Sequence, residues 1–135
     1  MKEVEISILG VQVEGEERNE ISSVVKGRLY KKRDTYYLKY KEKVQGLEGV
    51  KTTLKIEDEQ ITLIRQGQVR SIQKFVSDEK TEFDYKTPYG MLKLVIEVEE
   101  LKIDVGNVKG QVNIHYILHD QQQVISTNQL DITYK

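Results

Sequence analysis

The sequence predicts an all-β fold, a single antiparallel meander β-barrel of about ten strands that forms one domain over residues 1–135. Three observations support this prediction. Apolar and polar residues alternate along most of the chain, which is the period of a strand. The composition contains no alanine, one proline and eight tyrosines, and this favours pleated sheets. The alternating segments are joined by connections of two to five residues, which are too short for helical crossovers.

The first strand is predicted over Lys2–Glu14, and its apolar residues change face. They occupy even positions up to Ile8 and odd positions from Leu9 onward. One extra residue in a strand turns every later side chain to the other face. We therefore predict a β-bulge beside Gly10, followed by a polar turn over residues 15–19.

The middle of the chain contains five shorter alternating segments. Gly67 separates the last two and fits a tight turn that needs a positive φ. The predicted strands are 21–32, 35–43, 50–57, 60–66 and 69–76.

The segment 81–105 changes face twice. The first change is at Pro88, which we place second in a β-turn that ends at Gly90. The second is at Glu99–Glu100, where no turn residue stands, so Gly90–Val105 is predicted to be one long strand bent by a bulge. Two more strands, 111–119 and a last one ending at Tyr134, complete the meander.

Closure of the sheet follows from its edges. A meander without covering helices leaves its edge strands exposed unless the first and last strands pair. An even number of antiparallel strands closes without a parallel seam, so we predict a closed or nearly closed barrel. Eight strands approach the width that holds one small ligand, and ten would leave more room. An interior filled with side chains would argue against an internal ligand.

Charge and composition exclude several classes of protein. The 21 basic and 22 acidic residues create no global field toward nucleic acid or an anionic membrane. The chain has no cysteine, which excludes disulfides and thiolate metal sites. Acidic residues near the N-terminus do not fit a signal peptide, and no run approaches the ~18 apolar residues of a membrane helix. We expect a soluble cytoplasmic protein.

Two charged residues fall on strand faces that should point inward. Glu42 continues the apolar parity of Tyr36 and Tyr40, and Arg65 continues that of Leu63. An inward charge must be paired, hydrated or at the barrel mouth, so we predict that Glu42 and Arg65 approach one another near one opening. Together with the two tyrosines they are the candidate ligand-binding residues. A structural ion pair, or two strand ends that reach solvent, is the more common alternative.

The stretch 26–43 is the most basic part of the chain. Four tyrosines interleave there with eight lysines and arginines, opposed by two carboxylates. Aromatic residues among basic ones can bind single-stranded nucleic acid. The favoured alternative is charge complementarity within the sheet, because the first strand carries Glu3 and Glu5.

No other motif carries recognisable chemistry. His115 and His119 have a spacing that suits zinc on a helix, but four residues of a strand span ~13 Å, so we interpret them as surface histidines. The sequence contains no glycine-rich phosphate loop and no nucleophile elbow. We predict no cofactor and no metal.

Five fragments, in this order and spacing, resemble the YwiB-like family of uncharacterised bacterial calycin-like β-barrels. They are residues 36–42, 50–56, 64–67, 87–90 and 110–116, and together they extend over nearly the whole chain. The resemblance implies a lipocalin-related barrel and no known activity. Matching its pattern marks Tyr40, Glu42, Arg65, Thr87 and Gly90 as positions without known roles.

Three functions are compatible with these observations. The favoured one is a noncatalytic module that encloses a small amphipathic ligand in the barrel. The alternative is a protein- or RNA-interaction module that uses the basic outer sheet around 26–43. An enzyme ranks last, because no nucleophile, metal set or cofactor loop is recognisable.

Overall fold

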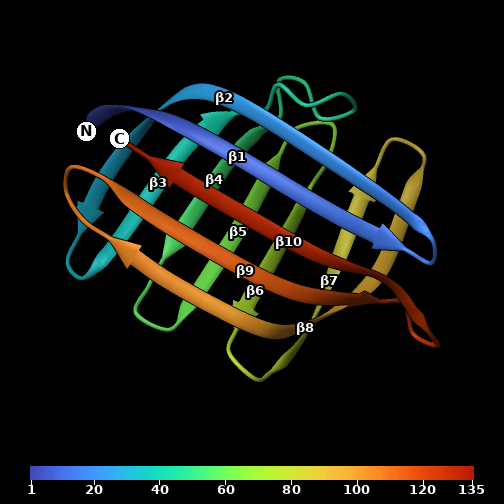
Figure 1. The fold of residues 1–135 in the computed structure, drawn as a ribbon. Coiled ribbons are helices and arrows are strands. Elements are labelled where there is room, and N and C mark those ends of the chain that lie inside the picture. The colour runs from blue at the N-terminus through green and yellow to red at the C-terminus, as the bar shows by residue number, and fades with distance from the viewer.

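Ten strands form one antiparallel sheet in the computed structural model, which describes residues 1–135 (Figure 1). Consecutive strands are hydrogen-bonded neighbours except at one seam, and the first strand pairs with the last. The predicted all-β meander is confirmed. No helix in the structure is long and apolar enough to cross a membrane. The strands are β1 (Lys2–Glu14), β2 (Glu17–Lys32), β3 (Thr35–Lys41), β4 (Lys51–Ile56), β5 (Gln60–Gln66), β6 (Ser71–Val76), β7 (Lys80–Thr87), β8 (Gly90–Val105), β9 (Gly110–His119) and β10 (Val124–Tyr134).

The sheet closes into a nearly complete barrel. β1 and β10 are paired without interruption. The seam lies between β6 and β7, which share one bridged pair, Arg70 with Lys86. The backbone N–H of each of these residues donates to the carbonyl oxygen of the other at 2.9 Å. The Thr81 hydroxyl also donates to the Lys74 carbonyl oxygen across the seam, at 2.6 Å.

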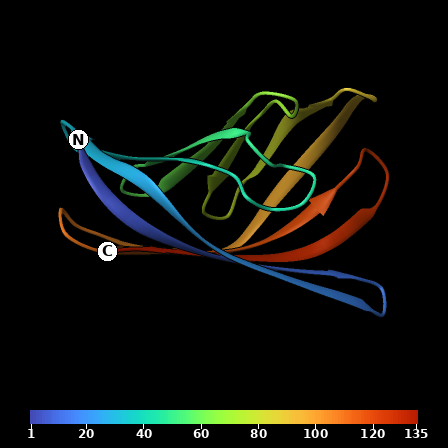
Figure 2. The same ribbon diagram turned by 90° about the horizontal axis from the view of Figure 1, so that it is seen from above.

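The two ends of the barrel differ in their turns. The terminal end carries both chain termini and the turns after β2, β4, β6 and β8, whereas the distal end carries the turns after β1, β3, β5, β7 and β9. Figure 2 shows the β1–β2 hairpin projecting at the distal end past the layer formed by β3–β6. The two ends therefore offer different surroundings to inward side chains.

Apolar side chains fill the middle and the terminal end of the interior. Burial of this surface is the main stabilising contribution to the fold. Among the fully buried side chains are Phe75, Ile6, Leu38, Leu54, Ile56, Ile61, Ile114 and Ile132. This packing confines any ligand site in the barrel to the distal end.

Two predicted irregularities are confirmed. The register between β8 and β9 shifts between Val98 and Glu100, as the second change of face predicts. Thr87 pairs with Gly90 across the two-residue turn that contains Pro88. The Thr87 hydroxyl oxygen accepts a hydrogen bond from the Tyr89 N–H at 3.1 Å, which stabilises this turn locally.

The predicted β-bulge beside Gly10 is wrong. The registers of β1 with β2 and with β10 run unbroken through this region. Leu9 and Val11 lie on the outer face, half-buried between neighbouring strands. The core-facing positions here are Gly10 and Gln12. Because these inward residues are small or polar, the apolar residues of the outer face gave the sequence the pattern of a change of face.

The polar turn predicted over residues 15–19 is also wrong, because the turn consists of Gly15 and Glu16 alone. Gly15 adopts a φ of 58°, which glycine reaches without steric cost. The following residues, 17–20, are polar and exposed, because the projecting hairpin has no core to face.

Gly27 lets β2 pass close to two neighbouring strands. A Cβ atom at Gly27 would collide with the backbone carbonyl oxygen of Lys39 and with the side chain of Ile6. The backbone of β3 would therefore have to move to accept any side chain here. Gly10 lies on the same face of the adjacent strand, and a Cβ atom there would meet its nearest atom, the Ile21 carbonyl oxygen, at 4.0 Å.

We expect Gly27→Ala to lower the free energy of unfolding by about 1–3 kcal/mol, because overpacking displaces neighbouring groups. Urea denaturation measures this change. Gly10→Ala is the control and should cost less than about 0.5 kcal/mol, since its Cβ has room and alanine restricts the unfolded chain. Equal losses in the two variants would show that the close approach at Gly27 is not what requires glycine.

Candidate functional site

The interior at the distal end has two walls of opposite character. On β1–β6 and β10 most core-facing positions become polar or small toward this end, with Ile21 of β2 as an apolar exception, and on β7–β9 most of them remain apolar. We call these the polar wall and the apolar wall. The polar wall includes Gln12, Ser23, Glu42, Thr52, Arg65, Ser71, Ser126 and Asn128. The apolar wall includes Phe83, Tyr85, Leu92, Leu94, Ile96 and Leu118.

Glu42 and Arg65 meet on the polar wall. The Glu42 Oε2 atom lies 3.6 Å from Arg65 Nε and accepts a hydrogen bond from the Thr52 hydroxyl at 2.8 Å. The Glu42 side chain is 4% exposed, whereas that of Arg65 is 19% exposed. The structure thus brings together the two charges that the parity argument paired. Their separation is too long for a hydrogen bond, so the Arg65 Nε–H is not used by Glu42.

Two phenols stand near this pair. Tyr40 is the cross-strand neighbour of Thr52. Burial raises the pKa of the Tyr40 hydroxyl far above its ordinary value, the Glu42 carboxylate raises it further, and Arg65 offsets part of this. Burial likewise raises the pKa of Tyr116, which Arg65 partly lowers. Both hydroxyls are therefore neutral hydrogen-bond donors at any physiological pH.

Three polar atoms of the polar wall are buried without a hydrogen-bond partner. They are the Ser23 Oγ, Arg65 Nε and Ser71 Oγ atoms. Buried polar groups in folded proteins are nearly always hydrogen-bonded, and leaving one unpaired costs about 1–3 kcal/mol. Because these atoms come from β2, β5 and β6, the polar wall keeps hydrogen-bonding capacity that the protein itself does not use.

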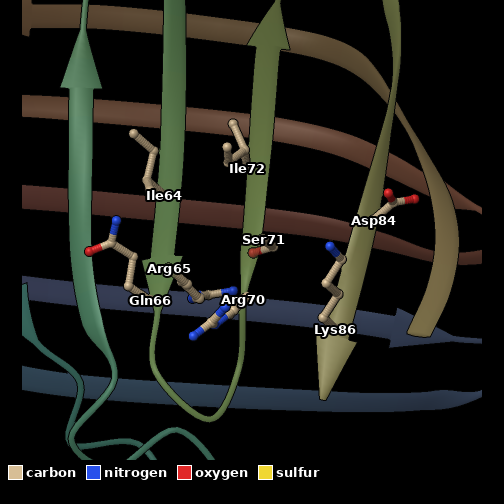
Figure 3. A pocket seen from close by; sticks show the side chains of 8 residues that line it. All are labelled: Ile64, Arg65, Gln66, Arg70, Ser71, Ile72, Asp84 and Lys86. Carbon is tan, nitrogen blue, oxygen red and sulfur yellow. The ribbon is translucent and has the colours of Figure 1, made fainter. Parts of the chain in front are cut away.

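A cleft of about 610 Å³ reaches Arg65 and Ser71 at the seam (Figure 3). In Figure 3, Arg65, Arg70 and Ser71 gather at the adjoining ends of β5 and β6, and Lys86 reaches from β7 toward β6. The remaining lining residues are Ile64, Gln66, Ile72 and Asp84. The cleft thus lies mainly on the outer face of the seam and touches the polar wall at Arg65 and Ser71.

Tyr36 lies at the terminal end, away from the other predicted site residues. Its hydroxyl donates to Asn107 Oδ1 at 3.0 Å in the β8–β9 turn. Tyr134 contacts the neighbouring residue of the chain, Gly106: its hydroxyl donates to the Gly106 carbonyl oxygen at 2.7 Å and accepts from the Gly106 N–H at 3.1 Å. These contacts tie the terminal end together. Of the four candidate residues, the structure groups Tyr40, Glu42 and Arg65, and it separates Tyr36 from them.

Sequence reasoning missed Ser23, Ser71 and Tyr116. A signal for Ser71 existed, because a tight hairpin around Gly67 would place it beside Arg65, as the observed register does. Nothing marked Ser23, since an inward serine looks like any surface serine in the sequence. Tyr116 packs edge-on against Phe75 at a ring separation of 5.0 Å, a contact between strands distant in sequence.

The basic stretch 26–43 lies mainly on the outer face of β2 and β3. Tyr30 and Tyr37 stack on each other there, with centroids 4.8 Å apart and planes at 5°. This stacking occupies aromatic faces that nucleic-acid bases would need. The register also places Arg28 opposite an acidic residue of β1, in line with charge complementarity. On its other side, however, Arg28 stands opposite Lys39 of β3, and Lys41 stands directly opposite Lys51.

The two histidines lie on the outer face of β9, each beside a different carboxylate. His119 Nε2 is 3.0 Å from Glu97 Oε1, and His115 Nδ1 is 3.7 Å from Glu100 Oε2. No group of three potential metal-ligating side chains of the His, Cys, Asp or Glu type occurs. The histidines are also separated from the interior serines by the sheet itself.

Comparisons with known proteins agree on the fold and give no activity. A family model described as a domain of unknown function, DUF1934, matches residues 6–132. The uncharacterized beta-barrel protein YwiB of Bacillus subtilis (strain 168) is 30% identical over 109 residues, which are 81% of this chain and 76% of that protein. The crystal structure of ywiB protein from Bacillus subtilis has a TM-score of 0.89 at 26% identity, covering 98% of this chain and 90% of that one.

We expect a double-mutant cycle of Glu42→Gln and Arg65→Met to give a coupling energy of about 1–3 kcal/mol in the free energy of unfolding. Removing Arg65 leaves a buried carboxylate with one hydrogen bond from Thr52, which is costly. The control cycle uses the exposed pair Lys55 and Glu57, 3.9 Å apart, through Lys55→Met and Glu57→Gln. Its coupling should stay below about 0.5 kcal/mol. Coupling near zero in the first cycle would contradict an energetic pairing.

Proposed function

The chain belongs to the DUF1934 family, and from this premise we propose that it is a noncatalytic module that binds a small amphipathic ligand at the distal end of its barrel. The observation that supports this function is the pairing of the two walls. One wall offers polar atoms without protein partners, and the facing wall offers apolar side chains. A molecule with a polar head and an apolar tail complements both, whereas water complements only the first.

Leu92 is the apolar residue best placed to receive the tail. It shares the face of the buried Leu94 and Ile96 on β8, yet 59% of its surface is exposed. On β2, Ile21 likewise occupies a core-facing position and is 50% exposed. Burying a leucine side chain completely contributes roughly 1.5–3 kcal/mol, so covering these two residues would supply much of a weak ligand's affinity.

A binding role suits these groups better than catalysis. Ser23 and Ser71 would each need an adjacent base to act as nucleophiles. Both histidines lie on the outer face of β9, and the one buried carboxylate nearby, Glu42, is already hydrogen-bonded to Thr52. Tyr40 and Tyr116 are held neutral by burial, which suits hydrogen-bond donation to a ligand. The packed core at the terminal end restricts this ligand to a short tail.

We expect 1-octanol, the simplest amphipathic probe, to shift backbone amide resonances of the two walls in a nuclear magnetic resonance titration. Leu92→Asp should weaken this binding at least fivefold, because it places a charge on the apolar wall. Met91→Asp is the matched control, since Met91 is the neighbouring residue, is 55% exposed and points outward. Equal effects of the two substitutions, or no binding by the unmodified protein, would refute the proposed site.

Native mass spectrometry of protein purified from cells provides an independent check. We expect the native mass to exceed the denatured mass by that of a small molecule, and the excess to disappear in Leu92→Asp. Met91→Asp should keep the added mass. A mass difference that persists unchanged in Leu92→Asp would place the ligand elsewhere.

The outer basic sheet supports a second candidate, a surface for a polyanionic partner. Lys41 and Lys51 stand directly opposite one another, and like charges so placed repel unless an anion neutralises them. The mutual stacking of Tyr30 and Tyr37 argues against base stacking. Filter binding of single-stranded RNA at low salt tests this candidate, and absence of retention would end the RNA version of it.

A further inference from the structure

We propose that the head group of this ligand is an oxyanion, held at the β6–β7 seam by Arg65, Arg70 and Lys86. This inference rests on the proposed function, because it assigns the chemistry of the head group of the same ligand. Carboxylates and phosphate esters share the required chemistry, which is a compact negative charge with several acceptor oxygens.

The seam carries unpaired positive charge. Arg70 and Lys86 form the one bridged pair that joins β6 to β7, and like charges directly opposite each other destabilise strand pairing. Neither forms an ion pair with a carboxylate; the ion pairs of the structure involve other residues. The bridge that closes the barrel therefore joins two residues whose positive charges repel each other, and a bound anion would reduce this repulsion.

The carboxylates near the cleft do not neutralise it. Asp84 lines the cleft, but Figure 3 shows its carboxylate directed away from β6. Glu42 lies 3.6 Å from Arg65 and is shared with the Thr52 hydroxyl. Three cationic side chains therefore line the cleft, and one carboxylate approaches one of them without a hydrogen bond.

Ser71 lines the cleft together with both arginines. It follows Arg70 in the chain and is the cross-strand neighbour of Arg65. Ser71 is 5% exposed, and its hydroxyl has no hydrogen-bond partner. A neutral hydroxyl donor beside guanidinium groups is a typical arrangement for oxyanion recognition, since Arg presents a planar fork of N–H donors.

The position of the seam also connects the head group to the apolar wall. Lys86 lies on the outer face of β7, whereas the preceding residue, Tyr85, faces inward and is the cross-strand neighbour of Leu92. A molecule seated between β6 and β7, beyond their single bridge, contacts both faces. An oxyanion between β6 and β7 would therefore hold a short apolar tail against Tyr85 and Leu92. This geometry predicts that one bound molecule contacts the cationic seam with its head group and the apolar wall with its tail.

The test compares octyl phosphate, octanoate and 1-octanol by amide chemical-shift titration at low salt. We expect both anions to bind about tenfold or more tightly than 1-octanol. In the double variant Arg70→Gln/Lys86→Gln this advantage should fall to less than about threefold, with the affinity for 1-octanol unchanged. The matched control is Lys102→Gln/Lys109→Gln, which also removes two exposed positive charges, at the terminal end of the barrel, and should keep the advantage.

The outcomes separate the two proposals. Equal binding of anions and alcohol to the unmodified protein, or equal losses in the two double variants, would overturn the oxyanion assignment and leave the amphipathic site standing. Inorganic phosphate that shifts the Ser71 and Lys86 resonances, without binding of any octyl compound, would support the anion site and overturn the amphipathic function. No response to any probe would overturn both.

Stability gives a readout that needs no ligand. Arg70→Gln/Lys86→Gln should have a thermal midpoint at least equal to that of the unmodified protein, because the repulsion across the bridge is removed. Inorganic phosphate should raise the midpoint of the unmodified protein and not that of this variant. A variant that is less stable in the absence of anions would contradict the view that repulsion between Arg70 and Lys86 destabilises the seam.

Discussion

Closure of the barrel is the constraint on which the remaining structure depends. No helix covers the sheet, so its edges must be satisfied within the sheet itself. The ladder between β1 and β10 does this over eight consecutive pairs, but the seam between β6 and β7 has only one bridged pair and one side-chain hydrogen bond. Closure also forces every inward side chain into one limited volume. The apolar core fills that volume at the terminal end, and the weak seam lies where the inward residues become polar.

The polar wall is difficult to explain as a stabilising device. Each partnerless buried atom costs about 1–3 kcal/mol, and domains of this kind are stable by only about 5–15 kcal/mol in total. The Glu42–Arg65 contact does not satisfy these atoms, because its 3.6 Å length leaves Arg65 Nε without a hydrogen bond. Apolar residues at these positions would be less costly. The partners of these atoms must come from outside the chain, either as solvent or as a ligand, and the facing apolar wall favours a ligand.

The alternation of inward and outward residues along strands, which we call parity, predicted much of the fold. In the site it predicted Tyr40, Glu42 and Arg65 but not Ser23, Ser71 or Tyr116. It placed the β8 bulge, the turn at Pro88 and the approach of Glu42 to Arg65, because alternation fixes which face a residue occupies. It failed at Gly10, where the inner lining becomes polar and apolarity no longer identifies the inward face. Parity also ignores distance along a strand, so it grouped Tyr36 with Glu42 although they are six positions apart, a distance of ~20 Å in an extended chain. The weak seam has no counterpart in local sequence.

Four pairs of like charges occupy directly opposite positions in the sheet, and two of them show how much their settings matter. The pairs are Glu14 with Glu17, Arg28 with Lys39, Lys41 with Lys51, and Arg70 with Lys86. Lys41 and Lys51 belong to a ladder of six consecutive pairs, so the other five hold the strands together whatever the lysines do. Both are exposed, where water screens the repulsion. Arg70 and Lys86 are also exposed, yet no neighbouring pair supports their bridge, and Arg65 adds a third cation from the interior. The same modest repulsion therefore has its largest structural effect at the seam, which makes seam closure sensitive to an anion there.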